Sequence, residues 1–311
     1  MISGKQNPAD RRGQESCALS WPAGHSINYT AFRDAIVAAG LEPPTHIESG
    51  RWIRFPGRGK GRDNRAGWCW LAPHEQAGAF GCWASGLSET WHAERHHFTL
   101  EERSAFGRQI TEAKKRAERE KVQTWNKAAA RALDIWHQAQ PASPDNAYLK
   151  RKAAAPYCAR QSGQRLVLPI VGWDGQLSSL QFIGPDGEKR MLKGGRKRGR
   201  FIPVNGTRGA SRILIAEGFA TAATLAEIEP EALTLAALDA GNLEAVAVEA
   251  RKRCPAAEII LAADADAVGT AKARAAAIAC AGLVAVPEFP PGAKGSDWND
   301  LAALQRQGGT P

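Results

Sequence analysis

The sequence predicts an α/β fold for the C-terminal third of the chain, where apolar strand-like runs alternate with helical segments. The runs with the length and composition of buried strands are 212–216, 233–237, 258–263 and 283–286. The helical segments that follow them are 219–228, 242–253, 269–281 and 299–306. This alternation predicts a parallel sheet with helices on both faces.

The first of these strands ends in a carboxylate and a glycine. Arg212 is followed by the apolar run Ile-Leu-Ile-Ala, then by Glu217, Gly218 and the helix at 219–228. Open α/β sheets bind their ligands beyond the carboxyl ends of the strands. We therefore expect Glu217 to face a ligand, and Gly218 to supply the conformational freedom for a sharp turn from strand to helix.

Further carboxylates follow the third and fourth strands. Asp264 and Asp266 come directly after the third strand, and the motif Ser-Asp-Trp-Asn-Asp at 296–300 supplies Asp297 and Asp300. Carboxylate oxygens that leave positions open suit Mg²⁺ or Mn²⁺ together with bound phosphates. The pattern predicts metal-assisted phosphoryl transfer. The structural alternative is that Asp264, Asp266 and Asp300 cap the helices beside them.

The composition indicates a soluble protein with a polyanionic partner. The 311 residues are 43% hydrophobic and 23% charged, with a formal net charge of +9. That length suits two or three domains of about 150 residues or fewer, and that charge favours a nucleic-acid partner. The six cysteines form no C-x-x-C pair, which indicates reduced cytoplasmic thiols and argues against a four-cysteine zinc ribbon. No apolar run reaches the ~18 residues of a membrane span, so we expect no membrane partner.

The N-terminal part predicts a small β domain. Residues 1–25 lack periodicity and are interpreted as a flexible arm, whereas 26–98 contain a short helix and several tryptophan-rich strands. Tryptophans beside a basic glycine-rich loop can hold single-stranded DNA. The residues proposed for that contact are Arg58, Lys60, Arg62, Trp68 and Trp70. The alternative is that the tryptophans form the core of a small domain. The Cys and His spacings predict no zinc site.

A long helix at 99–140 links this domain to a basic one at 141–208. Two hairpin-like segments, 165–171 and 177–183, meet across an Asp-Gly turn. A glycine-interleaved basic run follows, and its density beside Glu217 suits nucleoside triphosphates or a nucleic-acid backbone. The residues proposed for nucleotide and template binding are Lys189, Arg190, Lys193, Arg196, Lys197 and Arg198.

The order of the acidic motifs resembles the Toprim domain of DnaG-type primases, topoisomerases and some nucleases. Glu217-Gly218, then Asp264-x-Asp266, then the late acidic motif fall in 209–311 in that order. The hairpins and basic run resemble the basic half of a DnaG-type catalytic core, in which Lys189 matches one family lysine and Lys197 or Arg198 a second basic residue. The segments after Ala216 and after Gly78 most resemble primases of plasmids, phages and integrated elements.

The resemblance implies a particular architecture. It is an α/β Toprim parallel sheet preceded by a small basic mixed α/β subdomain, a long linker helix and a small, zinc-less, ribbon-like β domain. The four zinc ligands of the family's ribbon are missing, which puts zinc-dependent template reading in doubt. No G-x-x-x-x-G-K-[ST] motif occurs, so no helicase motor is expected in this sequence.

The resemblance implies a DNA primase that copies single-stranded template into short RNA primers. Glu217, Asp264 and Asp266 would be catalytic, and Asp297 or Asp300 would support a second Mg²⁺ or Mn²⁺. A replicative helicase or other replication protein of a mobile element is the expected partner. Two alternatives stay open: a Toprim nuclease or RNA-processing enzyme, and a non-catalytic single-stranded-DNA-binding accessory protein. Turnover with nucleotide incorporation separates primer synthesis from both.

Overall fold

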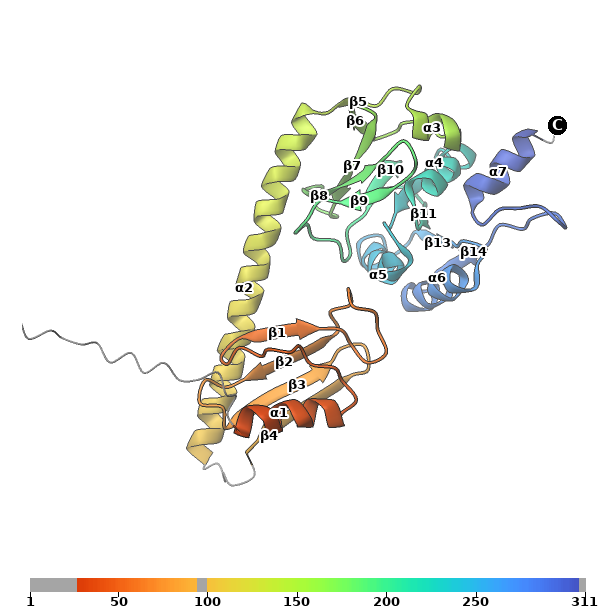
Figure 1. Cartoon of the computed structure of the whole chain (residues 1–311). Helices are drawn as coiled ribbons and strands as arrows, with labels where there is room; N and C mark the ends of the chain where they lie inside the picture. Colours follow the sequence, from red (N-terminus) through yellow and green to blue (C-terminus); the bar gives the residue numbers. More distant parts are fainter. Residues whose placement is uncertain (1–26, 94–99, 308–311) are drawn as a thin grey trace, which may run out of the picture. The chain divides into compact units, whose positions relative to one another are not determined.

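The computed structural model describes residues 27–93 and 100–307, so the predicted arm at 1–25 lies outside the described residues. The chain forms two compact units, Met1–Glu118 and Arg119–Pro311 (Figure 1). Within the described ranges, no helix is both long enough and apolar enough to cross a lipid bilayer.

The first unit contains one helix and a four-stranded antiparallel sheet. Its elements are α1 (Ile27–Ala38), β1 (Trp52–Phe55), β2 (Gly67–Leu71), β3 (Ala77–Cys82) and β4 (Leu87–His92), and the strands lie in chain order. Phe32 of α1 packs against Phe80, with ring centroids 6.0 Å apart, and against Trp91 at 5.3 Å. Strand β4 was not predicted, because its Leu-Ser-Glu-Thr-Trp-His sequence is polar and mostly exposed.

The tryptophans of this sheet are mainly structural. Trp68 stacks on Trp52 with ring centroids 4.8 Å apart and planes 12° apart. Trp68 and Trp70 are only 5% and 2% exposed, so neither ring is open to a nucleobase. The expected contact of these two rings with single-stranded DNA is therefore wrong, and the core alternative is correct. The exposed ring is Trp83, which is 54% exposed and carries the Arg54 guanidinium 3.9 Å from its centroid.

The long helix α2 (Leu100–Gln138) is continuous across the boundary between the units. In the second unit, Ala132 of α2 and Ala139, directly after the helix, pack with Trp136 against a five-stranded antiparallel sheet. The strands of that sheet are β5 (Gln140–Pro141), β6 (Arg160–Ser162), β7 (Arg165–Val171), β8 (Leu177–Ile183) and β9 (Lys189–Met191). The β7–β8 hairpin has the predicted bounds, and the short helix α3 (Ala147–Lys152) precedes β6.

The second sheet of this unit confirms the α/β fold class. Strands β11 (Arg212–Ala216), β12 (Leu233–Ala236), β13 (Glu258–Ala262) and β14 (Leu283–Ala285) are parallel, in the order β12-β11-β13-β14. Strand β10 (Ile202–Asn205) adds an antiparallel edge beside β12. Sequence periodicity did not predict β10, because Pro203 and Asn205 interrupt its apolar pattern.

Helices cover both faces of this sheet, as predicted. Helix α4 (Phe219–Ile228) packs with Leu214 and Ala216 on one face, in a core that also contains the inner side of β7. Helices α5 (Leu243–Arg253) and α6 (Ala267–Cys280) pack with Ile213 and Ile215 on the other. The last helix, α7 (Trp298–Gln307), contacts α4. These faces leave the carboxyl ends of the parallel strands as the place where a site can form.

Candidate active site

The carboxyl ends of two neighbouring strands bring Glu217 and Asp264 to one edge of the sheet. Ala216, the last residue of β11, is in register with Ala262, the last residue of β13. Glu217 therefore leaves its strand at the level where the chain turns toward Asp264. Both side chains are partly buried. This is the convergence that the spacing of the two acidic motifs predicted.

Asp264 is held by the first turns of α6. The Thr270 hydroxyl donates to the Asp264 carbonyl at 3.1 Å. Gly269 leaves room for this approach, because a Cβ there would lie 3.1 Å from the Asp264 Cβ. The Asp264 Oδ1 atom is buried and has no hydrogen-bond partner among the described residues.

The surroundings of Asp264 oppose its negative charge. Burial raises the pKa of Asp264 to about 6, and the neighbouring carboxylates Glu217, Asp297 and Asp266 add to that rise, in that order. Lys189 acts in the opposite direction. A carboxylate with an unpartnered buried oxygen and acidic neighbours is an arrangement that a bound cation would stabilise.

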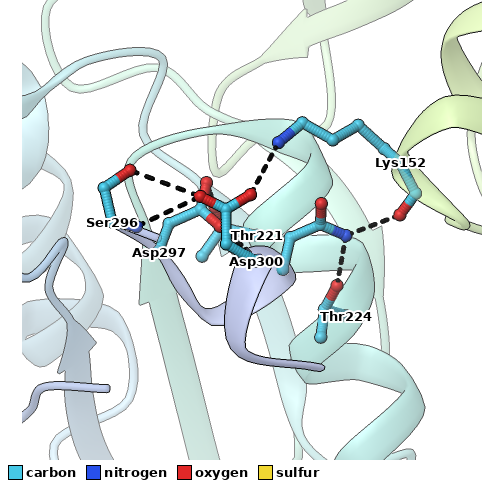
Figure 2. Close-up of polar contacts among 7 residues, drawn as sticks. Lys152, Thr221, Thr224, Ser296, Asp297 and Asp300 are labelled. Carbon is cyan, nitrogen blue, oxygen red and sulfur yellow. Dashed lines mark hydrogen bonds and ion pairs between the residues drawn. The ribbon is translucent and has the colours of Figure 1, made fainter. Parts of the chain in front are cut away.

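Asp297 is positioned by helices α4 and α7. The Thr221 hydroxyl lies 3.3 Å from Asp297 Oδ2, and the backbone N–H of Asp300 donates to Asp297 Oδ1 at 2.8 Å. Figure 2 shows this arrangement at the start of α7. Asp297 therefore caps α7 through one oxygen and faces α4 with the other. Thr221, in the first turn of the mainly apolar α4, was not predicted as part of the site; its only signal was that it is one of two threonines in that helix.

Asp300 is used as an anchor. It lies 3.2 Å from the Lys152 ammonium, and it accepts the Ser296 backbone N–H at 3.1 Å (Figure 2). Burial pushes the pKa of Asp300 upward, but the Ser296 and Lys152 hydrogen bonds outweigh burial and the net pKa is lowered. Asp300 is also absent from the groups that act on Asp264. The structural alternative weighed for this residue therefore describes it better than the metal-ligand interpretation.

Asp266 is the N-cap of α6, because its side chain accepts the Gly269 N–H at 2.7 Å. It is exposed, and it still contributes to the electrostatic field at Asp264. Asp266 therefore caps α6 through one carboxylate oxygen, as one of the two expectations for it held.

Two lysines from distant segments face these carboxylates. A Cβ on Gly218 would lie 3.2 Å from the Lys189 ammonium, so the missing side chain allows this lysine to approach the strand–helix turn. Gly218 itself has an ordinary extended backbone with φ −116°, so the expected need for unusual backbone freedom there is wrong. Lys197 pairs with Asp239, and Glu217 also acts on its ammonium.

Asn242 fastens the basic loop, residues 193–200, to the parallel sheet. Its Oδ1 accepts the Gly199 N–H at 2.8 Å, and its Nδ2 donates to the Arg200 and Ala237 carbonyls, each at 2.8 Å. The side chain is 3% exposed. Because Lys197 lies in this loop, Asn242 positions a cation near Glu217. Asn242 was not predicted to belong to the site, since an asparagine after glycine resembles an ordinary turn residue.

The remaining predicted basic residues lie elsewhere. Arg190 pairs with Glu188 at 2.8 Å, and Lys193 and Arg198 are exposed. The Arg196 guanidinium lies 4.9 Å from the Trp125 ring centroid on α2. In the first unit, the loop residues Arg58, Lys60 and Arg62 are exposed as expected. The predicted basic set is therefore divided between separate surfaces rather than gathered at one point.

The carboxylates suit a divalent cation, although their side chains are not closed around one position. Within residues 27–93 and 100–307, no three His, Cys, Asp or Glu side chains are grouped tightly enough to ligate a single ion. The unpartnered buried Oδ1 of Asp264 and the acidic groups around it nevertheless provide the hard oxygen donors that Mg²⁺ or Mn²⁺ prefers.

Comparisons with known proteins agree with this fold. A model of the Toprim domain matches residues 212–309. Two proteins named DNA primase TraC, both from Escherichia coli, are 32% and 33% identical to this chain, over 239 and 226 residues. These matches cover 71% and 67% of the chain but only 16% and 21% of the relatives. The chain therefore spans a small part of the length of these relatives.

A solved structure, the primase fragment of the bacteriophage T7 primase-helicase protein, is 12% identical with a TM-score of 0.41, covering 82% of this chain and 95% of that one. A score this low adds nothing to the assignment. The matched range, 212–309, includes Glu217, Asp264 and Asp297. Residues 212–309 thus match the Toprim domain, and about two thirds of the chain is similar in sequence to a part of proteins named DNA primase.

Proposed function

We propose that this chain is a DNA primase that makes short RNA primers on single-stranded DNA. The observation that carries the proposal is Asp264, whose buried, unpartnered oxygen faces an acidic group of residues from two further segments. A nucleotidyltransferase needs such carboxylates to hold the divalent ion that neutralises a triphosphate. The similarity to proteins named DNA primase supports the same reaction.

Each residue of the site would have a distinct role. Glu217, Asp264 and Asp297 would hold Mg²⁺ or Mn²⁺, with the second oxygen of Asp266 available to them. The ion would supply charge neutralisation at the phosphates of a nucleoside triphosphate. Glu217 would also accept the proton of the attacking 3′ hydroxyl. Lys189 and Lys197 would bind the triphosphate, and Asp300 would keep α7 in place through Lys152.

The remaining basic residues would bind the template. Arg190, Lys193 and Arg198 are charged and accessible, as a contact with a phosphate backbone requires. Single-stranded DNA is therefore the proposed macromolecular substrate. A replicative helicase or another replication protein of a mobile element is the proposed partner, in the cytoplasm.

A primer assay tests this proposal. The full chain is incubated with single-stranded DNA, labelled ribonucleotides and Mg²⁺ or Mn²⁺, and the products are separated by length. We expect short labelled RNA from the wild type and at least a hundredfold less from Asp264→Asn. Full activity of Asp264→Asn would remove the metal assignment. Shortened template without labelled RNA would indicate the nuclease alternative.

A further inference from the structure

A groove in the second unit lies between α2, the turn that joins β7 to β8, and the basic loop. Its volume is about 190 Å³. The residues of the lining that matter here are Trp125, Asn126, Gln176, Leu177, Arg196 and Arg200. Arg196 was predicted to bind nucleotide or template, and the other five were assigned to no site.

The charge of the groove favours an anion. The lining contains two guanidinium groups, those of Arg196 and Arg200, and one carboxylate, that of Asp174. Asp174 pairs with Arg200 at 3.5 Å, so it does not compensate Arg196. Burial lowers the pKa of Arg200, and the neighbouring Arg196 lowers it further. A phosphate between the two guanidiniums would relieve this repulsion.

The uncharged part of the lining fits a nucleobase. Trp125 is partly exposed, and its ring centroid lies 4.9 Å from the Arg196 guanidinium and 4.6 Å from the Lys121 ammonium. Aromatic rings and guanidinium planes are the two surfaces on which unpaired bases stack. Leu177 adds an apolar wall, and the amides of Asn126 and Gln176 offer both donors and acceptors to a base edge.

We propose that this groove binds one nucleotide unit of single-stranded nucleic acid, with its phosphate at Arg196 and Arg200 and its base at Trp125. The inference deepens the proposed function, since the bound strand would be the template. A strand is favoured over a free triphosphate because Arg196 faces α2, whereas the neighbouring Lys197 faces Asp239 and Glu217. Arg196 therefore lines the groove, whereas Lys197 lies beside the carboxylates.

The test measures binding of a labelled oligothymidine by fluorescence anisotropy over a range of salt concentrations. The full chain is used with EDTA, so primer synthesis plays no part. We expect Arg196→Gln to lower the salt dependence, the slope of log K against log[salt], by about 0.7 for one lost phosphate contact. Trp125→Leu should weaken binding about tenfold, and Trp125→Phe should largely restore it. The control is Arg131→Gln, the same charge change at an exposed position of α2 outside the groove, which should match the wild type.

The same variants are then tested for binding of ATP with Mn²⁺. Unchanged ATP binding together with weakened oligothymidine binding supports the proposal. Weakened ATP binding with normal oligothymidine binding would assign the groove to a triphosphate, and no change in either would leave it without a ligand; both results overturn the proposal. Loss of primer synthesis in Asp264→Asn with intact oligothymidine binding keeps the two proposals separable.

Discussion

At the scale of single residues, the molecule separates side chains that react from side chains that hold them. Asp264 has an unpartnered oxygen, whereas Asp266 and Asp300 are occupied by the Gly269 N–H and by Lys152. Chemical type is the same in all three, so the sequence predicted the acidic group but not this division. Which aspartates are paired depends only on where the neighbouring hydrogen-bond donors lie in the folded chain.

Asp264 is expected to destabilise the folded chain when no metal is present. Its pKa of about 6 in the folded chain lies above the ordinary pKa of an aspartate, so the folded state binds the proton more tightly. The destabilisation is therefore complete above pH 6 and disappears as the pH falls toward 4. After a discount for partial exposure it is about 1 kcal/mol at pH 7.

Asp264→Asn should therefore raise the Tm in EDTA at pH 7 by about 2–4 °C. The gain should shrink steadily between pH 6 and pH 4, which thermal unfolding at several pH values measures. As a comparison, Asp266→Ala should lower the free energy of unfolding by about 1 kcal/mol, because it removes a helix cap. A Tm gain for Asp264→Asn that is constant with pH would contradict the role given to its charge.

Asn242→Ala should loosen the basic loop. The change leaves the Gly199 N–H and the Arg200 and Ala237 carbonyls without their side-chain partner. We expect the free energy of unfolding to fall by about 2 kcal/mol, and KM for the nucleotide to rise more than kcat falls, since Lys197 would lose its position. Urea unfolding and steady-state kinetics measure the two effects.

The control for Asn242 is Asn205→Ala, because Asn205 makes one hydrogen bond, to the Pro230 carbonyl at 2.8 Å, and is less buried. Asn205→Ala should lower the free energy of unfolding by less than about 1 kcal/mol and leave KM for the nucleotide unchanged. An Asn242→Ala chain with wild-type KM would show that this side chain serves stability alone.

At the scale of elements, periodicity predicted most of the second unit. Helix α4 has the predicted bounds, and the four parallel strands start where apolar runs start. Strands β4 and β10 were missed, because one is polar and exposed and the other carries proline and asparagine. Strand β10 pairs with β12, which is not its neighbour in the chain, and β4 pairs with the preceding strand β3 despite its polar sequence. Local patterns do not encode the pairing of either strand.

Asn299 is a buried side chain that attaches helix α7, in addition to the Asp300–Lys152 pair. Asn299 is 1% exposed and donates to the Lys152 carbonyl at 2.7 Å and to the Thr224 hydroxyl at 3.0 Å. Asn299→Ala should therefore speed amide hydrogen exchange throughout 298–307 about tenfold and lower metal affinity through Asp297. Arg306→Gln, which breaks a 3.8 Å surface pair with Glu227, should do neither. Equal exchange in both variants would show that Asn299 does not anchor the helix.

At the scale of the whole molecule, each unit has a hydrophobic core of its own. The residues around Phe32 and Phe80 form one core, and the cores beneath the two sheets of the second unit lie within 119–311. The boundary at Glu118 falls inside α2, the helix predicted to link two domains, but the unbroken helical pattern did not indicate where along the helix it lies.

A fragment covering 119–311 should fold alone. It keeps the part of α2 that packs on the antiparallel sheet and both cores of the second unit. Circular dichroism should show one cooperative thermal transition, with a Tm within about 5 °C of the corresponding transition of the full chain. A fragment without cooperative unfolding would show that the second unit depends on the first.

The basic loop has one more consequence, which follows from the adjacency of Arg196 and Lys197. Their Cα atoms are about 3.8 Å apart, yet one side chain lies at Trp125 and the other at Asp239. A strand bound by Arg196 would shift the position of the Lys197 side chain. Binding of the template and affinity for the triphosphate would then be thermodynamically linked. If a bound strand changes the affinity for nucleotide by some factor, bound nucleotide must change the affinity for the strand by the same factor.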